Sequence, residues 1–308
     1  ALVIPDVERK FIPGFAERLA ADMELDLDKT LMIFPDQDVE PEPRYRKFPR
    51  KDFWIAGIAD RIYPVSIRPK GNLQRLMELF AIIPDRVEEK FRLKYSRSNR
   101  SAFNPSQLPP MEPLEDWDYI THWTRTTIEP WEGESKADYC RSIAEASAGY
   151  SHDGFGSLCN ILRESRIYAT DKLIRGGHKV VSLTELPPWD IQPLMKYRHR
   201  LLRWTFEPYG IAFRKDKLQE LGARKVLYGE DYQYRFLQGE DCAFFQSVGK
   251  NGDDWRPEKE WRVAGDINLQ DFSPEEALVI VRTFDEAEEL GEWSPFPVIY
   301  WEKDDNQQ

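Results

Sequence analysis

In the first third of the chain, short apolar runs alternate with stretches in which apolar residues recur at helical spacing. The apolar runs cover 1–6, 29–36 and 62–69, and the helical stretches cover 8–24, 50–61 and 72–83. In the stretch 50–61, Phe53, Ile55 and Ile58 form the expected apolar face. This strand–helix order predicts a small parallel α/β sheet over residues 1–110.

Residues 96–117 interrupt this order. The segment is rich in Ser, Asn and Pro and has little hydrophobic periodicity, which is typical of a connection between domains. We therefore expect a domain boundary near residue 110.

The second part, 111–308, contains many short apolar or alternating runs and few helical ones. Helical spacing is found at 156–165, 215–222 and 284–291, and the last two end on Gly222 and Gly291, where a left-handed C-cap is expected. A run of strands with few helices predicts an α+β domain around a mixed or antiparallel sheet.

Charge and composition narrow the class of protein. The chain has 308 residues and a net charge of −11; residues 1–110 hold 19 Lys and Arg against 17 Asp and Glu, and the remainder 24 against 37. Such an acidic second part does not favour non-specific nucleic-acid binding, although the basic stretch 44–51 could contact phosphate or form a solvated turn. We find no membrane-length apolar run and no signal-peptide pattern, and we expect a cytoplasmic protein without membrane contact.

Metal and disulfide chemistry are not expected. The three cysteines are scattered without CxxC spacing, and the four histidines lack HxxxH spacing. Oligomeric state is left open, a homo-oligomer included.

Polar residues recur on one face of three expected strands. Successive side chains of a strand alternate between its faces, so residues two apart share a face. This places Glu258, Glu260 and Arg262 together opposite Trp261 and Val263, Ser182 with Thr184 opposite Val181 and Leu183, and His122 with Ile120 and Thr124. If the three polar faces meet in one cleft, it holds a histidine, two hydroxyls and two carboxylates.

Each of these motifs also has a structural interpretation. Glu260 and Glu258 could belong to a charged edge strand in which Arg262 pairs with a glutamate. His122 could be a hydrogen-bonded structural histidine, Ser182 and Thr184 could bond across strands, and Tyr209 could be a core aromatic residue. The ordered set of motifs favours a functional site more than any single motif does.

That ordered set, over about 118–265, resembles the ADP-ribosyltransferase fold, and more closely uncharacterised or abortive-infection bacterial families linked to it. The matching segments are "ITHWTR", "LCNILRESRIYAT", "VVSLTE", "PYGIAFR" and "EKEWRV". The resemblance implies cleavage of NAD, with Glu260 stabilising an oxocarbenium-like ribose and Glu258 orienting or deprotonating the acceptor. It implies that His122 or Arg125 holds the nucleotide, that Ser182 and Thr184 support Glu260 or the nicotinamide amide, and that Tyr209 stacks on nicotinamide.

Residues 44–80 are similar to part of the Rossmann-like domain of the DNA-processing protein A and lysine-decarboxylase-like superfamily. The matching pattern is "FPRKDFWIAGIAD", followed by the apolar run that begins at Ile62 and by the turn "RPKGN". The resemblance implies a second nucleotide site made by Arg50, Arg68, Gly71 and Asn72, with the turn at the carboxyl end of a strand. A degenerate domain that only packs or dimerises fits the same residues.

The function expected from the sequence is NAD-dependent transfer of ADP-ribose to a macromolecule, nucleic acid or protein, in phage defence or as a toxin. NAD is then a substrate, and no metal is expected. The alternatives are a catalytically inactive nucleotide-binding sensor and an interaction protein that docks through its acidic second domain.

Overall fold

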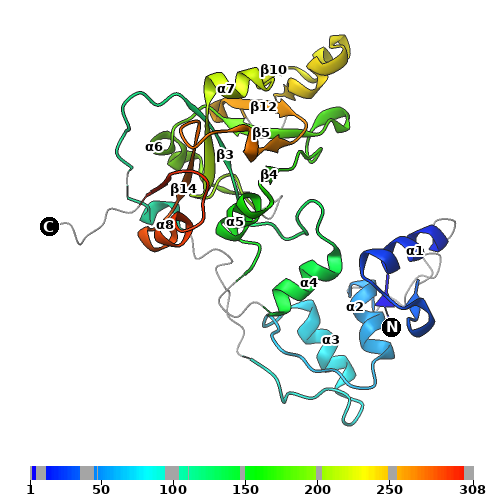
Figure 1. Cartoon of the computed structure of the whole chain (residues 1–308). Helices are drawn as coiled ribbons and strands as arrows, with labels where there is room; N and C mark the ends of the chain where they lie inside the picture. The colour runs from blue at the N-terminus through cyan, green and yellow to red at the C-terminus, as the bar shows by residue number, and fades with distance from the viewer. Residues whose placement is uncertain are drawn as a thin grey trace. The chain divides into compact units, whose positions relative to one another are not determined.

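The computed structural model describes residues 2–4, 12–34, 45–46, 48–93, 104–109, 111–145, 150–198, 203–248 and 255–301. The chain divides into two compact units (Figure 1). The first comprises Ala1–Ala102 with Ser135–Ala137, and the second comprises Phe103–Glu134 with Asp138–Gln308.

The described residues of the N-terminal unit form three α-helices and one short pair of strands. The helices are α1 (Ile12–Asp22), α2 (Arg50–Ile58) and α3 (Asn72–Phe80), and β1 (Leu2–Val3) pairs in parallel with β2 (Met32–Ile33). Its small core contains Phe48, Ala56, Ile67, Leu76 and Met77. The described part of this unit therefore has the expected parallel pairing in two-residue strands.

Two details of the predicted N-terminal unit are wrong. The third expected strand, 62–69, is reduced to a single bridge between Ile62 and Val87. In α2 the small residue Ala56 is buried, whereas Ile55 and Ile58 are exposed. A three-turn helix places only a narrow stripe against so small a core, and apolar spacing alone did not identify which stripe.

The second unit is built on a mixed seven-stranded sheet. Its order is β15-β14-β8-β3-β5-β12-β9, and all neighbours are antiparallel except β14 and β15. The strands are β3 (Tyr119–Trp123), β5 (Val180–Thr184), β8 (Gly210–Arg214), β9 (Arg224–Lys225), β12 (Glu260–Ala264), β14 (Ala277–Val281) and β15 (Val298–Tyr300). The chain is thus a mixed α/β protein with one large mixed sheet.

The described residues of this part of the chain also form three two-stranded pairs and five α-helices. The pairs are β4 (Arg166–Ile167) with β13 (Ile267–Asn268), β6 (Tyr197–Arg198) with β7 (Arg203–Trp204), and β10 (Leu227–Gly229) with β11 (Phe245–Ser247). The helices are α4 (Lys136–Glu145), α5 (Gly154–Glu164), α6 (Pro188–Ile191), α7 (Lys215–Glu220) and α8 (Phe284–Gly291).

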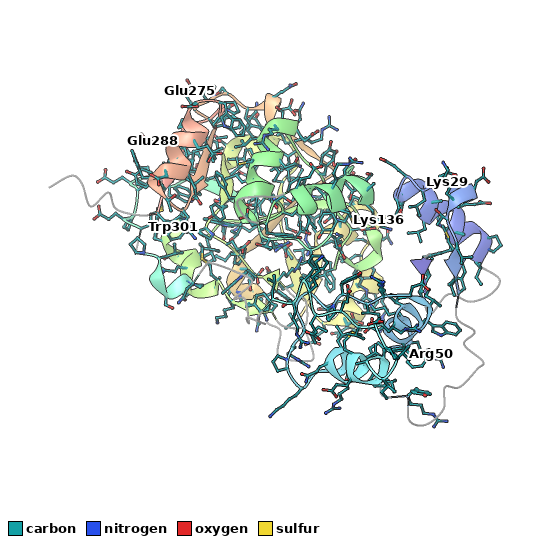
Figure 2. The ribbon with its side chains drawn as sticks, turned by 90° about the horizontal axis from the view of Figure 1, so that it is seen from below. Lys29, Arg50, Lys136, Glu275, Glu288 and Trp301 are labelled. Carbon is teal, nitrogen blue, oxygen red and sulfur yellow. The ribbon has the colours of Figure 1, made fainter. Side chains whose placement is uncertain are left out.

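Hydrophobic cores cover both faces of the large sheet. On one face Leu158 and Leu162 of α5 pack with alternate residues of every long strand, such as Ile120 and Trp261. On the other face Ile191 of α6 packs in a second cluster that includes Trp301, the buried residue labelled in Figure 2. Alternate positions along β3, β8 and β14 therefore face different cores, as the period of a strand requires.

Local signals fix the ends of α5 and α7. The Asp153 side chain accepts a hydrogen bond from the Gly156 amide at the start of α5, and Ser165 ends the helix in the left-handed conformation. Gly222 follows α7 with φ +88°, as predicted. Gly291 does not cap α8, because the helix includes it and Glu292 follows in a right-handed conformation.

Candidate functional site

A row of polar side chains crosses the middle of the large sheet. Thr121 of β3 lies opposite Thr184 of β5, which lies opposite Glu260 of β12; in the next row, Ser182 lies opposite Arg262. Register partners point to the same face, so these side chains share one face. As predicted, Ser182 shares a face of the sheet with Thr184, and Glu260 shares it with Arg262. Trp261 and Val263 lie on the opposite face, buried in the core.

Glu260 is held by its neighbours on both sides. The Ser182 hydroxyl donates to Glu260 Oε1 at 2.8 Å, and Arg262 donates from Nε to Oε1 at 2.8 Å and from Nη2 to Oε2 at 3.2 Å. Arg262 is itself buried, and its Nη1 also donates to the carbonyl oxygens of Ala243 and Phe245. The carboxylate of Glu260 is therefore fixed in a bidentate ion pair, as the structural interpretation of this motif proposed.

Glu258 does not belong to the strand. It ends the short 3₁₀ helix Arg256–Glu258, and Lys259 follows with φ 45°, so the chain turns before β12 begins. The sequence had placed Glu258 on the strand face with Glu260, and this placement is wrong because the left-handed Lys259 breaks the alternation. The Thr184 hydroxyl donates to the backbone carbonyl of Glu258 at 2.5 Å and joins the turn to the sheet.

The free carboxylate of the pair is Glu258. Within the described part of the chain, its side chain accepts no hydrogen bond. Burial raises the pKa of Glu258 to about 7, the charge of Glu260 adds to this, and Arg125, Arg198 and Arg203 oppose it. A carboxyl group with this pKa can exchange a proton near neutral pH.

Arginines face the two carboxylates. Burial and the charge of Arg203 lower the pKa of Arg125 to about 10, and burial lowers the pKa of Arg203, yet both stay cationic at neutral pH. Arg125 donates to the Thr205 carbonyl at 3.2 Å. In the described ranges, neither Arg125 nor Arg203 has a carboxylate oxygen within 4.0 Å. Two partly buried cations without a close ion pair favour an anionic ligand.

His122 reaches this site from the opposite face of the sheet. By strand alternation it shares a face with Ile120, as predicted, and not with Glu260. However, β3 and β5 pair only at Thr121 and Thr184, and beyond this pair the His122 ring lies with Nδ1 2.9 Å from the Ser182 carbonyl oxygen. A carbonyl oxygen only accepts, so Nδ1 carries the proton. Burial lowers the pKa of His122 to about 4, which leaves Nε2 as an acceptor at neutral pH.

One cavity of about 350 Å³ joins these groups. Its lining includes His122, Arg125, Ser182, Thr184, Glu258 and Glu260, together with Arg198, Arg203 and Arg262. The volume lies within the range of about 300–1,000 Å³ typical of small-molecule sites. The expected cleft thus brings together a histidine, two hydroxyls, two carboxylates and several arginines.

Tyr209 lies outside this cavity. Its side chain is buried in the core beside Phe155, and its hydroxyl donates to Glu286 Oε1 at 2.9 Å. Burial raises the pKa of Tyr209, so the phenol stays protonated. The expectation that Tyr209 stacks on nicotinamide is wrong for this geometry, and its interpretation as a core aromatic residue is confirmed.

The residues of the second expected nucleotide site belong to the N-terminal unit and not to this cavity. Arg50 begins α2, and the turn from Arg68 to Gly71 leads into Asn72 at the start of α3. The turn precedes a helix, as expected, but it does not lie at the carboxyl end of a strand, since Ile62 contributes only a bridge.

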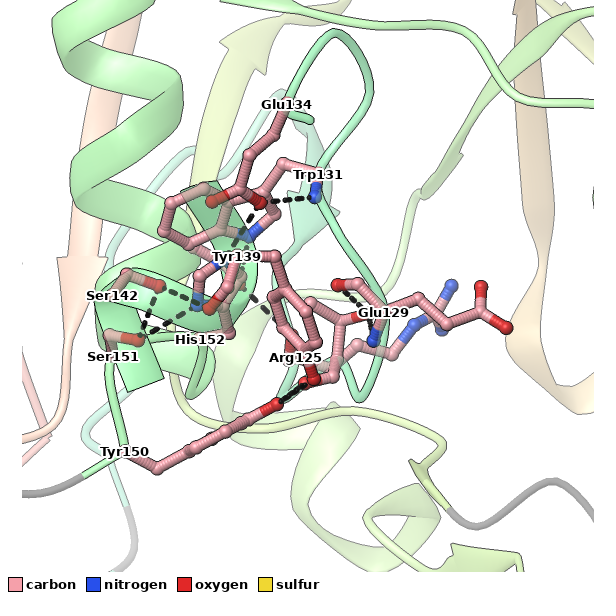
Figure 3. A network of polar contacts seen from close by, with 11 residues as sticks. Arg125, Glu129, Trp131, Glu134, Tyr139, Ser142, Tyr150, Ser151 and His152 are labelled. Carbon is pink, nitrogen blue, oxygen red and sulfur yellow. Dashed lines mark hydrogen bonds and ion pairs between the residues drawn. The ribbon is translucent and has the colours of Figure 1, made fainter. Parts of the chain in front are cut away.

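A second polar network holds the loop that follows β3 (Figure 3). His152 is fully buried; its Nδ1 lies 2.9 Å from the Ser151 hydroxyl and its Nε2 lies 2.8 Å from Glu134 Oε2. The same Glu134 oxygen accepts from the Trp131 amide at 2.9 Å, and the indole of Trp131 stacks on the His152 ring with centroids 3.7 Å apart. Trp131 also lines the cavity.

Several residues of the cavity were not expected from the sequence. Arg203 and Arg198 lie in the basic run "KYRHRLLRW", which could have been recognised as a cationic cluster. Thr121 has no such signal, because only the pairing of β3 with β5 brings it beside Thr184. Trp131 stands in a loop without periodicity, and only its contacts identify it.

Comparisons of the chain with protein-family models, with curated proteins and with solved structures found no match. In the described ranges, no helix has the length and apolar character needed to cross a lipid bilayer. The chemistry of the site therefore rests on its geometry.

Proposed function

We propose that this protein cleaves the nicotinamide–ribose bond of NAD and transfers ADP-ribose to a macromolecular acceptor, a nucleic acid or a protein. The observation that carries the proposal is the cavity in which a free, partly buried carboxyl, Glu258, faces the arginines Arg125 and Arg203 beside a fixed carboxylate, Glu260. An ADP-ribosyltransferase-like fold for the C-terminal unit, a Rossmann-like origin for the N-terminal unit, cytoplasmic location and a role in phage defence or as a toxin are parts of this proposal.

The arginines suit the diphosphate of NAD. They are cationic at neutral pH and partly buried, and an anion between them would compensate charges that no described carboxylate compensates at close range. In this arrangement Arg125 holds phosphate and His122 accepts a hydrogen bond from a ribose hydroxyl through Nε2. This assigns different roles to the two residues between which the sequence could not choose.

The carboxylates suit the reacting ribose. As the bond from the anomeric carbon to the pyridinium nitrogen breaks, its electron pair leaves with neutral nicotinamide and positive charge develops on the ribose. Glu260, already fixed by Ser182 and Arg262, needs no reorganisation to face that charge. The acceptor then bonds to the anomeric carbon and gives its proton to Glu258, whose pKa of about 7 suits a general base.

The test is incubation of the purified chain with labelled NAD and with DNA, RNA and protein acceptors. We expect nicotinamide release and label transfer in the wild type, and a loss of transfer of about 100-fold in Glu258→Gln. Glu288→Gln, the same chemical change at an exposed site on α8, is the matched control and should behave as wild type (Figure 2). Absence of nicotinamide release from the wild type with every acceptor would refute the proposal.

A nucleotide-binding protein without turnover is the second candidate. The observation that favours it is the bidentate pairing of Glu260 with Arg262, which offsets the charge that an oxocarbenium ion needs. It predicts that NAD or ADP-ribose binds, that no nicotinamide is released, and that Glu258→Gln does not abolish binding.

A further inference from the structure

Trp131 forms a rigid aromatic wall at one end of the cavity. Three contacts fix it: the indole stacks on His152 at 3.7 Å with 21° between the planes, its Nε1 donates to the Ser157 hydroxyl at 3.2 Å, and its amide donates to Glu134 at 2.9 Å. His152 covers one face of the indole, so another ring can stack only on the opposite face. A side chain held in this way loses little conformational entropy when a ligand binds.

The support beneath Trp131 is continuous and polar (Figure 3). The Tyr139 ring meets His152 edge-on, with centroids 4.7 Å apart, and its hydroxyl lies 2.8 Å from that of Tyr150. The Tyr150 hydroxyl donates to the Thr127 carbonyl at 2.6 Å, so the network holds the loop at both ends. The network therefore fixes a loop whose residues Arg125 and Trp131 both line the cavity.

Ser157 connects Trp131 to Arg125, and Asn160 lies near Ser157 on the same helix. Its hydroxyl accepts from Trp131 and also donates to the Arg125 carbonyl at 3.3 Å. Asn160 lies one turn further along α5, on the same side of the helix as Ser157, and also lines the cavity. Within the described residues, the Asn160 amide has no hydrogen-bond partner.

We infer that Trp131 and Asn160 form a subsite for adenine. An indole face binds a nucleobase by stacking, and an asparagine amide pairs with adenine by donating to N7 and accepting from the 6-amino group. Because the Ser157 hydroxyl joins Trp131 to the Arg125 carbonyl, the base lies beside the proposed phosphate-binding arginine. The inference rests on the proposed function in taking a nucleotide as the ligand, and it adds which base is selected and by which residues.

The experiment measures the dissociation constants of three ligands by calorimetry on the full chain. ADP-ribose carries adenine and does not turn over, its hypoxanthine counterpart has a 6-keto group in place of the amino group, and nicotinamide mononucleotide lacks the second base. Trp131→Leu should weaken ADP-ribose binding about 5- to 150-fold, as expected for the loss of one base stack. Binding of nicotinamide mononucleotide should change less than about twofold, which also shows that Trp131→Leu is folded.

Asn160→Ala tests the second residue independently. The wild type should prefer ADP-ribose over its hypoxanthine counterpart by about 5-fold or more, and Asn160→Ala should remove this preference. Equal weakening of all ligands by Trp131→Leu, unchanged ADP-ribose affinity, or no base preference in the wild type would each overturn the subsite. A subsite that fails while nicotinamide release persists leaves the proposed function intact, and a subsite confirmed without release identifies a binding protein.

Discussion

Glu258→Gln should make the protein more stable at alkaline pH and leave it unchanged at acid pH. The pKa of Glu258 rises from 4.5 to about 7 on folding, a difference of about 2.5. At 1.36 kcal/mol for each pH unit, ionising this group in the folded chain costs about 3 kcal/mol. Glutamine keeps the shape of the protonated acid and removes the ionisation.

The sign follows from which state releases its proton first. Below pH 4.5 both states hold the proton, so Glu258 carries no penalty. Between pH 4.5 and 7 the unfolded chain releases the proton while the folded chain retains it, and the free energy of unfolding falls as pH rises. Above about pH 7 the loss is complete, so the advantage of Glu258→Gln should grow by about 3 kcal/mol between pH 4.5 and 8.

Urea unfolding followed by tryptophan fluorescence, at pH 4.5 and at pH 8, measures this difference. His122 titrates in the same window, but it is present in both proteins and cancels in the comparison. Glu288→Gln should show a difference between the two pH values of less than about 0.5 kcal/mol. An equally small or an opposite difference for Glu258→Gln would show that Glu258 is solvated in the folded chain, and the general-base role would lose its basis.

Three further substitutions test the remaining contacts. Glu260→Gln should destabilise the chain by about 3–5 kcal/mol, because Arg262 would remain buried without its carboxylate; the double variant Glu260→Gln/Arg262→Met should recover most of this in denaturant unfolding, and no recovery would contradict the ion pair. Tyr209→Phe should leave nicotinamide release unchanged and cost about 1 kcal/mol for the lost bond to Glu286; an activity loss of 10-fold or more would return Tyr209 to the site. Arg203→Met should weaken ADP-ribose binding about 10-fold or more and reduce its salt dependence, and unchanged affinity in calorimetry would exclude phosphate contact.

The alternation of residues along strands was the most reliable guide in the sequence. It correctly predicted that Ser182 and Thr184 share a face and that Trp261 is buried, because the period of a strand is fixed by its backbone geometry. It failed at Glu258, where Lys259 adopts a left-handed conformation that no residue pattern signalled. Alternation also does not show how firmly Glu260 is held, which depends on its hydrogen bonds with Arg262 and Ser182.

Tertiary arrangement explains what the sequence could not predict. Tyr209 faces a core, whereas Arg203 lines the cavity, and their residue types do not distinguish these two environments. Trp131 depends for its position on His152 and Glu134, which lie in the non-helical segments that precede α5 and α4. Such contacts join segments without periodicity, and no local preference specifies them.

β3 and β5 are joined by a single register pair, Thr121 with Thr184, so the backbone ladder of the large sheet is shortest at its centre. On one side stand β15, β14, β8 and β3, and on the other β5, β12 and β9, each internally paired by several residues. The cavity lies where the two halves separate, since its lining takes His122 from β3 and Ser182 from β5. The core on the face of α5 nevertheless spans both halves, because it includes Ile120 of β3 and Leu183 of β5. The sheet is therefore held together beside the cavity by side-chain packing, where its backbone ladder provides only one pair of residues.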